Sequence, residues 1–410
     1  MIKRHPITII QGGQYGSEAK GAITGYICET EAVDIAVRTG AVNAGHTVYY
    51  QGKKVVMQQL PCGWVNPNTQ LVLGAGAMIH PKILADECAM VSTITGKDVR
   101  NRLWIDLNAG VHDESHTLRS AESGRHHAIG ATGKGCSEAI IDKVRGRGAG
   151  YKTFGDLDLH QYHIVDTAQM LNHEFDIGAK LLIEGTQGTL LDLNTGPYPY
   201  TTHKSVLPAA WMTECGLSPA LPTDIVMVVR TYPIRVAGNS GPMPQEISWP
   251  ILAREINNKC RMMGLRPIVA EQAILDFEAA HEMISNDPEW QKRSGNERLS
   301  ETNAAALREL PAATVAELSK LFELTTVTKK LRRVARLNFP TLEWAAKLCR
   351  PHRIALTFMN YQFPNYWFMY GDWALPADQL KYIGRIEAAC GAWVALVSFG
   401  PRPEHVLRLV

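Results

Sequence analysis

Short apolar runs that end directly at glycines recur along this chain, and this pattern limits the folds open to it more than any other feature. Such runs lie at residues 7–10, 32–38, 71–73 and 180–183. The first stops at Gln11-Gly12-Gly13, and the last runs into Glu184-Gly185-Thr186-Gln187-Gly188. An apolar run bounded by glycines is typical of a buried strand that feeds a tight loop. We therefore expect several buried strands whose ends carry glycine-rich loops.

Helical patterns separate several of these runs, and three further candidate strands follow at residues 224–229, 354–357 and 393–398. Strands that alternate with helices predict an α/β fold with a mostly parallel sheet and helices on its faces. In such a sheet, ligands bind outside the carboxyl ends of the strands, where the glycine loops gather. We expect a single large domain over residues 1–410, with its chemistry on glycine-rich phosphate loops that resemble P-loops.

The stretch Glu246–Leu324 differs from the rest of the chain. It is charged, rich in helical patterns and poor in strand patterns, and residues 286–303 are polar. We interpret residues 246–324 as a helical insertion on the core rather than a separate domain, with an exposed polar segment and no catalytic residue.

The composition sets limits on partners and location. The 410 residues carry a formal net charge of only +2, too small to favour nucleic acid or an anionic membrane as the main partner. No apolar run approaches the roughly 18 residues that a bilayer-spanning helix needs. The eight cysteines form no C-x-x-C pair, and no N-terminal signal peptide is evident. We therefore expect a cytoplasmic protein without a zinc site of the usual spacing.

The first loop, residues 12–21, has the composition of a phosphate-binding turn. Its glycines let backbone N–H groups approach phosphate oxygens, and Lys20 supplies a positive charge. It is not a Walker A loop, because Ala19 precedes the lysine and Gly21 follows it where Ser or Thr is required. On its own, this loop is equally compatible with a structural turn.

Five further segments favour the functional interpretation. They are residues 43–47 (NAGHT), 129–135 (IGATGKG), 184–192 with 198–200 (EGTQGTLLD and YPY), 235–244 (RVAGNSGPMP) and 398–401 (SFGP). With the first loop, they resemble in order the signature loops of the adenylosuccinate synthetases, among them G-D-E-G-K-G, N-A-G-H-T and E-G-A-Q-G-T-L-L-D. The resemblance spans nearly the whole chain.

This resemblance implies a carbon–nitrogen ligase that joins L-aspartate to C6 of a 6-oxopurine monophosphate, using a nucleoside triphosphate and Mg²⁺. It places the triphosphate on Gly16, Ser17, Glu18, Ala19, Lys20, Gly21, Gly45, His46 and Thr47, with Arg332, Asn360, Ser398, Gly400 and Pro401 completing that site. Ser17 and the Gly45 carbonyl fall at the positions of metal ligands.

The same resemblance assigns the catalytic set to Ser17, Lys20, His46 and Gln187. His46 matches the acid that stabilises the phosphoryl group passing to O6 of the purine. A histidine suits this role because its unperturbed pKa lies near neutral pH.

Two further groups of residues match the family's contacts to its other substrates. The purine monophosphate would contact Asn43, Thr132, Gln187 and Thr202, with Arg147 as a stand-in for a family arginine where Gly146 falls. The carboxylates of aspartate would be held by Gly238, Val327, Thr328, Lys330, Arg332 and Arg333, in a segment that resembles T-G-R-R-R-R. Without the family context, that segment is an ordinary exposed basic run.

The resemblance also implies a homodimer with a shared active site.

Ser17 is the first departure from the family pattern. It replaces an aspartate that takes the N1 proton of inosine monophosphate and binds magnesium. A serine hydroxyl is a poor base at neutral pH, so this role cannot transfer unchanged, and an ordered water is one hypothesis for the base. The smaller side chain leaves room for a 2-amino group on the purine.

The second departure lies in residues 356–360 (LTFMN), where the family has L-T-K-L-D and its aspartate selects GTP. Asn360 offers both a donor and an acceptor, which can pair with N1 and the 6-amino group of adenine. Phe358 replaces a lysine that contacts the base. We therefore predict ATP or dATP in place of GTP, with tolerance of several bases as the alternative.

Together, the two departures resemble the phage-type branch of the family, the 2-aminoadenylosuccinate synthetases, which act on dGMP with ATP. The expected product is N6-succino-2-amino-2'-deoxyadenylate, a precursor in diaminopurine nucleotide biosynthesis. If the gene is phage-encoded, the site of action is the host cytoplasm. Two alternatives stay open: an adenylosuccinate synthetase that uses IMP or dIMP, and an inactive nucleotide-binding regulator.

Overall fold

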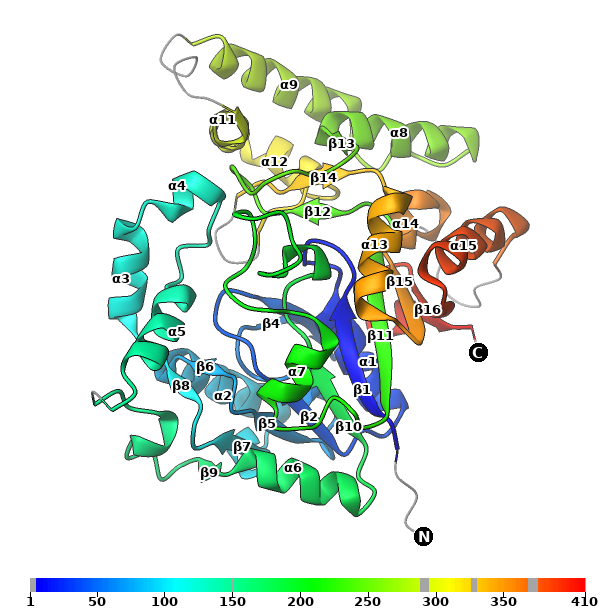
Figure 1. The fold of residues 1–410 in the computed structure, drawn as a ribbon. Helices are drawn as coiled ribbons and strands as arrows, with labels where there is room; N and C mark the ends of the chain where they lie inside the picture. The colour runs from blue at the N-terminus through cyan, green and yellow to red at the C-terminus, as the bar shows by residue number, and fades with distance from the viewer. Residues whose placement is uncertain (1–4, 149, 288–294, 326–329, 368–374, 410) are drawn as a thin grey trace.

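A ten-stranded sheet forms the centre of the computed structural model, which describes residues 5–148, 150–287, 295–325, 330–367 and 375–409 (Figure 1). The strand order is β17-β16-β15-β11-β1-β10-β2-β5-β7-β9, and every pairing is parallel except that of β16 with β17. The strands are β1 (Ile7–Gly12), β2 (Ile35–Arg38), β5 (Gln70–Leu73), β7 (Leu103–Asp106), β9 (His163–Val165), β10 (Leu181–Glu184), β11 (Thr223–Arg230), β15 (Arg353–Thr357), β16 (Trp393–Ser398) and β17 (Val406–Arg408). The predicted α/β fold with a mostly parallel sheet is confirmed.

All seven strands predicted from the sequence are present, and they are consecutive in the sheet, from β16 to β5. One boundary was wrong: β2 begins at Ile35 rather than Ala32, because Ala32 has a φ of 50° and lies in the turn before the strand. The strands that sequence reasoning missed are the short ones toward the two edges, β7, β9 and β17. Each is short and contains or adjoins charged or polar residues, and none is followed directly by a glycine loop.

Helices cover both faces of the sheet, as the alternation of side chains along β11 shows. Val226 and Val228 pack with the residues of α1 and α2, whereas Met227 and Val229 pack with those of α13 and α15. The helices outside the insertion are α1 (Lys20–Thr30), α2 (Pro81–Thr95), α3 (Glu114–Glu122), α4 (Arg125–Ile129), α5 (Cys136–Arg145), α6 (Thr167–Asp176), α7 (Pro208–Glu214), α13 (Phe339–Cys349), α14 (Met359–Gln362) and α15 (Ala377–Cys390). None of the described helices is long and apolar enough to cross a membrane.

Three small sheets lie outside the main one. They are β3 (His46–Tyr50) with β4 (Lys53–Met57), β6 (Met78–Ile79) with β8 (Gly110–Val111), and β14 (Arg333–Ala335) between β12 (Ile234–Arg235) and β13 (Glu246–Ile247). In the last of these sheets, β12 precedes the segment 246–324, β13 begins it and β14 follows it, so the two ends of the segment lie close together.

The segment 246–324 is helical, as expected, and its helices gather at the top of the molecule in Figure 1. They are α8 (Trp249–Met262), α9 (Glu271–Ser285), α11 (Gly295–Glu309) and α12 (Ala312–Leu318). The prediction that residues 286–303 are exposed is only partly correct. Asn286 and Asp287 are exposed, but Thr302 on α11 is buried, because α11 packs against α9. That these residues form an insertion in one domain stays a prediction.

The position of β1 between β10 and β11 brings two predicted loops into contact. Ile10 is level with Glu184, so the chain leaves both strands at the same edge. The loops touch at Gly188, where a Cβ would lie 2.3 Å from the Gln14 carbonyl oxygen and 2.4 Å from the Gly16 nitrogen. Only glycine permits this approach.

Asp192 fixes the loop that follows β10. Its buried carboxylate accepts hydrogen bonds from the backbone N–H groups of Asn194 (2.9 Å), Thr195 (3.0 Å) and Val206 (2.7 Å), and from the Ser205 hydroxyl (2.7 Å). Burial raises the pKa of Asp192, but the hydrogen bonds from Ser205 and the backbone outweigh it, so the pKa lies below its ordinary value. The loop therefore depends on an ionised carboxylate.

We predict that Asp192→Asn lowers the free energy of unfolding by about 3 kcal/mol at neutral pH, because charged hydrogen bonds to the loop are lost. A depressed pKa adds stability above the unfolded-state pKa, and this stability disappears as the pH falls through the folded-state pKa. Urea unfolding of both proteins should therefore converge in acid.

Asp156→Asn is the matched control for this loop. Asp156 also accepts from a backbone N–H and a hydroxyl, both of Thr153, but it is exposed, so its substitution should have a much smaller effect. Equal effects at Asp192 and Asp156 would contradict the structural role of Asp192.

Candidate functional site

The carboxyl ends of the central strands open into a cleft with a volume of about 1620 Å³. This exceeds the usual range for a single small-molecule pocket, so several ligands can be accommodated together. Most residues predicted for the site line this cleft. They are Gly16, Ser17, Ala19, Lys20, Gly21, Asn43, Gly45, His46, Thr47, Thr132, Gln187, Thr202, Lys330, Arg332, Asn360, Ser398, Gly400 and Pro401.

Six other predicted residues are not among those that line the cleft. Val327 and Thr328 lie outside the described residues. Gly238 follows the lining residue Ala237, and Arg147 is exposed after α5. Glu18 and Arg333 are buried, with their side chains bonded to protein groups.

The cleft is strongly basic. Its charged lining residues, within the described part of the chain, are cationic with one exception: Lys20, Lys54, Arg125, Lys134, Arg230, Arg235, Lys320, Lys330 and Arg332 oppose the single carboxylate of Glu323. Low-dielectric walls concentrate such a field. The cleft is therefore suited to ligands with several negative charges, although the net charge of the whole chain is close to zero.

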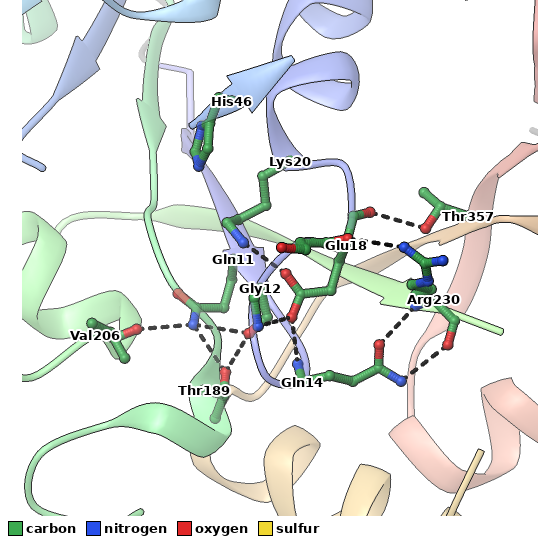
Figure 2. A network of polar contacts seen from close by, with 12 residues as sticks. Gln11, Gly12, Gln14, Glu18, Lys20, His46, Thr189, Val206, Arg230 and Thr357 are labelled. Atoms are coloured by element: carbon green, nitrogen blue, oxygen red, sulfur yellow. Dashed lines mark hydrogen bonds and ion pairs between the residues drawn. The ribbon is translucent and has the colours of Figure 1, made fainter. Parts of the chain in front are cut away.

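Glu18 shapes the first loop from inside, as Figure 2 shows. One carboxylate oxygen accepts from the N–H groups of Gln14 (3.1 Å) and Gly16 (2.7 Å), and the other from the Lys20 ammonium (2.7 Å). The Glu18 side chain is fully buried. Its predicted contact with the triphosphate is thus not supported for the side chain, which holds Lys20 and the loop in place.

Arg333 also differs from its predicted role. Its guanidinium donates to both carboxylate oxygens of Glu246 (2.7 Å for Nε), to the Ser240 hydroxyl (3.0 Å) and to the Gly241 carbonyl (2.7 Å). These bonds connect β14 to β13 and to the loop after β12. Arg333 therefore has a structural role here, and Lys330 and Arg332 are the cations of this segment that line the cleft.

His46 has a partner that sequence reasoning did not assign. Its Nδ1 contacts the Glu184 carboxylate, which also accepts from the Cys62 backbone N–H (2.6 Å) and faces the Arg38 guanidinium at 3.4 Å. Burial, with the nearby charge of Arg38, lowers the pKa of His46 well below neutral pH. This corrects the expectation of an ordinary histidine pKa, because burial and the nearby guanidinium both disfavour the charged imidazolium.

The signal for Glu184 was present in the sequence, since Glu184 opens the EGTQG segment. The contact itself depends on the register of β10 beside β2 and on the start of β3, which only the folded chain shows.

Ser17 faces a cation. The Arg332 guanidinium donates to the Ser17 hydroxyl oxygen at 2.6 Å and to the Leu324 carbonyl at 3.2 Å. Burial lowers the pKa of Arg332 to about 10, which still leaves it charged at neutral pH. The Ser17 hydroxyl is therefore a poor fit to the predicted magnesium ligand, whereas Gly45 lines the cleft and a backbone carbonyl is an oxygen donor of the kind that Mg²⁺ prefers.

Asn360 lines the cleft together with the aromatic residues Phe358, Tyr361 and Trp367. Asn360 is buried, and its Oδ1 has no hydrogen-bond partner within the described structure. Beside it, the Arg230 guanidinium lies 3.5 Å from the centre of the Phe358 ring, and the Tyr361 ring stacks on Trp367. Buried polar atoms usually have a hydrogen-bond partner, and the described protein groups supply none to this oxygen.

Glu323 is the residue that the sequence interpretation excluded, because it lies in the segment 246–324. It forms a bidentate ion pair with Arg230 and accepts from the Tyr361 hydroxyl at 2.8 Å. Burial raises the pKa of Glu323, but the charge of Arg230 outweighs this and keeps the pKa below its ordinary value. The helical segment thus contributes a charged group to the wall of the cleft.

A family model described as adenylosuccinate synthetase matches residues 9–161 and 157–362. The chain belongs to the adenylosuccinate synthetase family. It is therefore a carbon–nitrogen ligase, and its family uses Mg²⁺ and a nucleoside triphosphate, as predicted.

Named relatives and solved structures agree with this assignment. The adenylosuccinate synthetase of Thermococcus sibiricus is 28% identical over 407 residues, 98% of both chains, and that of Methanocaldococcus jannaschii is 36% identical over 244 residues, 59% of this chain and 68% of the relative. A solved structure titled cyanophage S-2L succinoaminodeoxyadenylate synthetase (PurZ), bound to dGMP and dATP as an energy donor, has a TM-score of 0.71 and 26% identity, covering 99% of this chain and 96% of its own.

We predict that Glu184→Gln lowers kcat by on the order of 100-fold, because an amide cannot stabilise a protonated His46. The carboxylate raises the pKa of His46 against the effect of burial. Activity that needs the imidazolium is present below this pKa and is lost as the pH rises through it. The alkaline fall in kcat should therefore move to lower pH in the variant, as a pH–rate profile would show.

Glu87→Gln is the matched control for this measurement. Glu87 is a buried carboxylate that accepts from the backbone of Gln59 (3.1 Å) and Leu60 (2.8 Å), in the segment that leads to Cys62. Its hydrogen bonds within the described structure go to this backbone and not to His46, so its substitution should change stability and leave the alkaline limb in place. If the pH of the alkaline fall in kcat is the same in Glu184→Gln as in the native protein, His46 is not the acid.

Proposed function

We propose that this protein joins L-aspartate to C6 of dGMP using ATP or dATP, and so makes N6-succino-2-amino-2'-deoxyadenylate for diaminopurine nucleotide synthesis. The observation that carries the proposal is Asn360, an amide in the cleft wall with an unpartnered oxygen. The likeness to the cyanophage synthetase bound to dGMP and dATP supports it across nearly the whole chain.

Asn360 suits an adenine base. Its Oδ1 can accept from the 6-amino group while its amide nitrogen donates to N1, whereas a carboxylate would repel the N1 lone pair. Phe358 lies in the same wall, and Arg230 holds it by a cation–π contact. An aromatic ring in this place offers a stacking surface to the base.

Ser17 suits a purine with a 2-amino group, because it is smaller than the aspartate of the ordinary family. The only carboxylate among the described lining residues, Glu323, is paired with Arg230. With no free carboxylate there, we assign removal of the N1 proton to a water molecule. The Arg332 guanidinium beside Ser17 adds positive charge that stabilises the O6 anion formed by this step.

The triphosphate would lie on the backbone of residues 16–21 and 45–47, with Lys20 neutralising its charge. The Gly45 carbonyl would hold Mg²⁺ together with phosphate oxygens, and the metal would neutralise charge on the transferring phosphoryl group. His46 gains a proton as the triphosphate approaches and hydrogen-bonds the phosphoryl group that O6 attacks. Gln187 would orient O6.

O6 of dGMP forms a bond to the γ-phosphorus as the bond from that phosphorus to the departing nucleoside diphosphate (ADP or dADP) breaks. The 6-phosphoryl group is then displaced from C6 by the amine of aspartate, which releases phosphate. Asn43, Thr132 and Thr202 would contact the monophosphate, and Gly238, Val327, Thr328, Lys330 and Arg332 are proposed for aspartate.

A homodimer fits two further features of the surface. Leu118 on α3 and Val144 on α5 are apolar and exposed (65% and 54%), on helices that pack together. Arg147 follows α5, is exposed, and is not among the described residues that line the cleft of its own chain. In a homodimer with a shared active site, Arg147 would serve the monophosphate of the other subunit.

Synthesis of adenylosuccinate from IMP or dIMP is the second candidate. The names of the archaeal relatives favour it, since they are adenylosuccinate synthetases at 28–36% identity. The two functions differ in both nucleotides, and so a single assay separates them.

Phosphate release with aspartate and Mg²⁺ should be measured while dGMP, GMP and IMP are crossed against ATP, dATP and GTP. We predict turnover with dGMP and an adenine triphosphate, and little with IMP and GTP. The reverse pattern would establish the second candidate. Absence of turnover with every pair would contradict both.

We predict that Asn360→Asp changes the preference for the triphosphate, whereas Ser17→Asp changes the preference for the purine monophosphate. Asn360→Asp should shift the triphosphate preference toward GTP by on the order of 10- to 100-fold in kcat/KM, because a carboxylate accepts from the N1–H and 2-amino groups of guanine. Ser17→Asp should raise activity with IMP and lower it with dGMP, without changing the triphosphate preference. Each variant thus serves as the control for the other, and unchanged preferences would contradict the assigned contacts.

A further inference from the structure

A buried thiol lies beside the catalytic histidine, and the proposed reaction does not use it. The Cys62 sulfur, a ring nitrogen of His46 and a Glu184 carboxylate oxygen lie within 4.8 Å of one another, and all three residues are buried. The backbone N–H of Cys62 already bonds to Glu184, which fixes the position of the thiol-bearing residue next to the pair.

We propose that His46, Cys62 and Glu184 form an inhibitory binding site for a thiophilic divalent cation, with Zn²⁺ as the physiological candidate. An ion bound there takes Nδ1 of His46 and the Glu184 carboxylate together. His46 then loses the partner that supports its protonation, and the ligase stops.

The chemistry of the three ligands selects the metal. Thiolate, imidazole and carboxylate are the ligands of zinc sites, and three protein ligands leave a fourth position for water or a phosphate oxygen. Mg²⁺ prefers an octahedron of oxygens and retains its water, so the magnesium that the reaction requires does not compete well for sulfur. The site therefore distinguishes the inhibitory cation from the one that the family uses.

Binding requires a defined proton balance. The Cys62 thiol releases its proton to solvent, and the imidazole proton moves from Nδ1 to Nε2 so that Nδ1 can donate its lone pair to the metal. The Arg38 guanidinium, 3.4 Å from Glu184, opposes the cation. Binding adds two positive charges and one thiolate, so we expect a weaker and more reversible site than a structural zinc centre.

His46 is the only one of the three ligands that lines the cleft in the described structure, which gives the site an entrance. Gly21 packs directly against both groups: a Cβ there would be 2.8 Å from the His46 Cβ and 2.9 Å from the Cys62 sulfur, so only glycine fits beside them.

Binding can be measured without turnover by titrating the full-length protein with Cd²⁺ and recording the ultraviolet charge-transfer band of a cadmium–thiolate bond. The native protein and Cys136→Ser should show the band, and Cys62→Ser should not. Cys136 is the matched control because it is a buried thiol in the wall of the same cleft without a place in the cluster. A band of equal intensity in Cys62→Ser would overturn the proposal.

Inhibition is measured by adding Zn²⁺ to the Mg²⁺-dependent reaction and then a chelator selective for zinc. We expect reversible inhibition of the native protein and of Cys136→Ser, and at least about a tenfold higher inhibitory concentration for Cys62→Ser. Equal sensitivity of Cys62→Ser would contradict the proposal. This arm uses whichever nucleotide pair supports turnover, so its outcome does not depend on the preference for dGMP.

X-ray absorption at the zinc edge covers the case in which Cys62→Ser fails to fold. The zinc-loaded native protein should show one sulfur ligand with nitrogen and oxygen ligands. A coordination shell of nitrogen and oxygen alone would overturn the assignment of Cys62.

Discussion

The parallel pairing of β1 with β10 on one side and β11 on the other is the constraint on which the site depends. It brings the loop after β1 and the loop after β10 to the same edge of the sheet, close enough that Gly188 cannot carry a side chain. The neighbouring strands β2 and β15 then add the segments that bear His46 and Asn360. The order of the central strands thus determines which loops and side chains lie together at the cleft.

The distribution of charge is the second constraint on the site. The cleft gathers cations against one paired carboxylate, and below it His46 is buried with Glu184 and Arg38. Such an arrangement holds the imidazole neutral in the free protein, and negative ligands favour its protonation. In the proposed mechanism, the proton state of His46 is therefore coupled to substrate binding. The same burial underlies the proposed metal site at Cys62, since the groups that stabilise a proton are also metal ligands.

The sequence was sufficient for the central strands and for most residues of the cleft, because glycines after apolar runs report where strands end. It was insufficient where function depends on the direction of a side chain. Glu18 and Arg333 belong to motifs that resemble ligand-binding loops, yet both face protein groups. Glu323 carries no motif at all, and its place in the cleft comes from tertiary packing. The roles given to Val327 and Thr328 stay predictions.

The ion pair between Arg230 and Glu323 couples the helical segment 246–324 to the wall of the cleft. Glu323 ends the helical segment, and its carbonyl accepts the N–H of Arg332, so one residue joins the segment to both Arg230 and the cationic strand leading into β14. A buried arginine left without its counter-charge is costly. Any change in the helical segment that removes Glu323 therefore also destabilises Arg230 in the wall of the cleft, which couples the segment to the site.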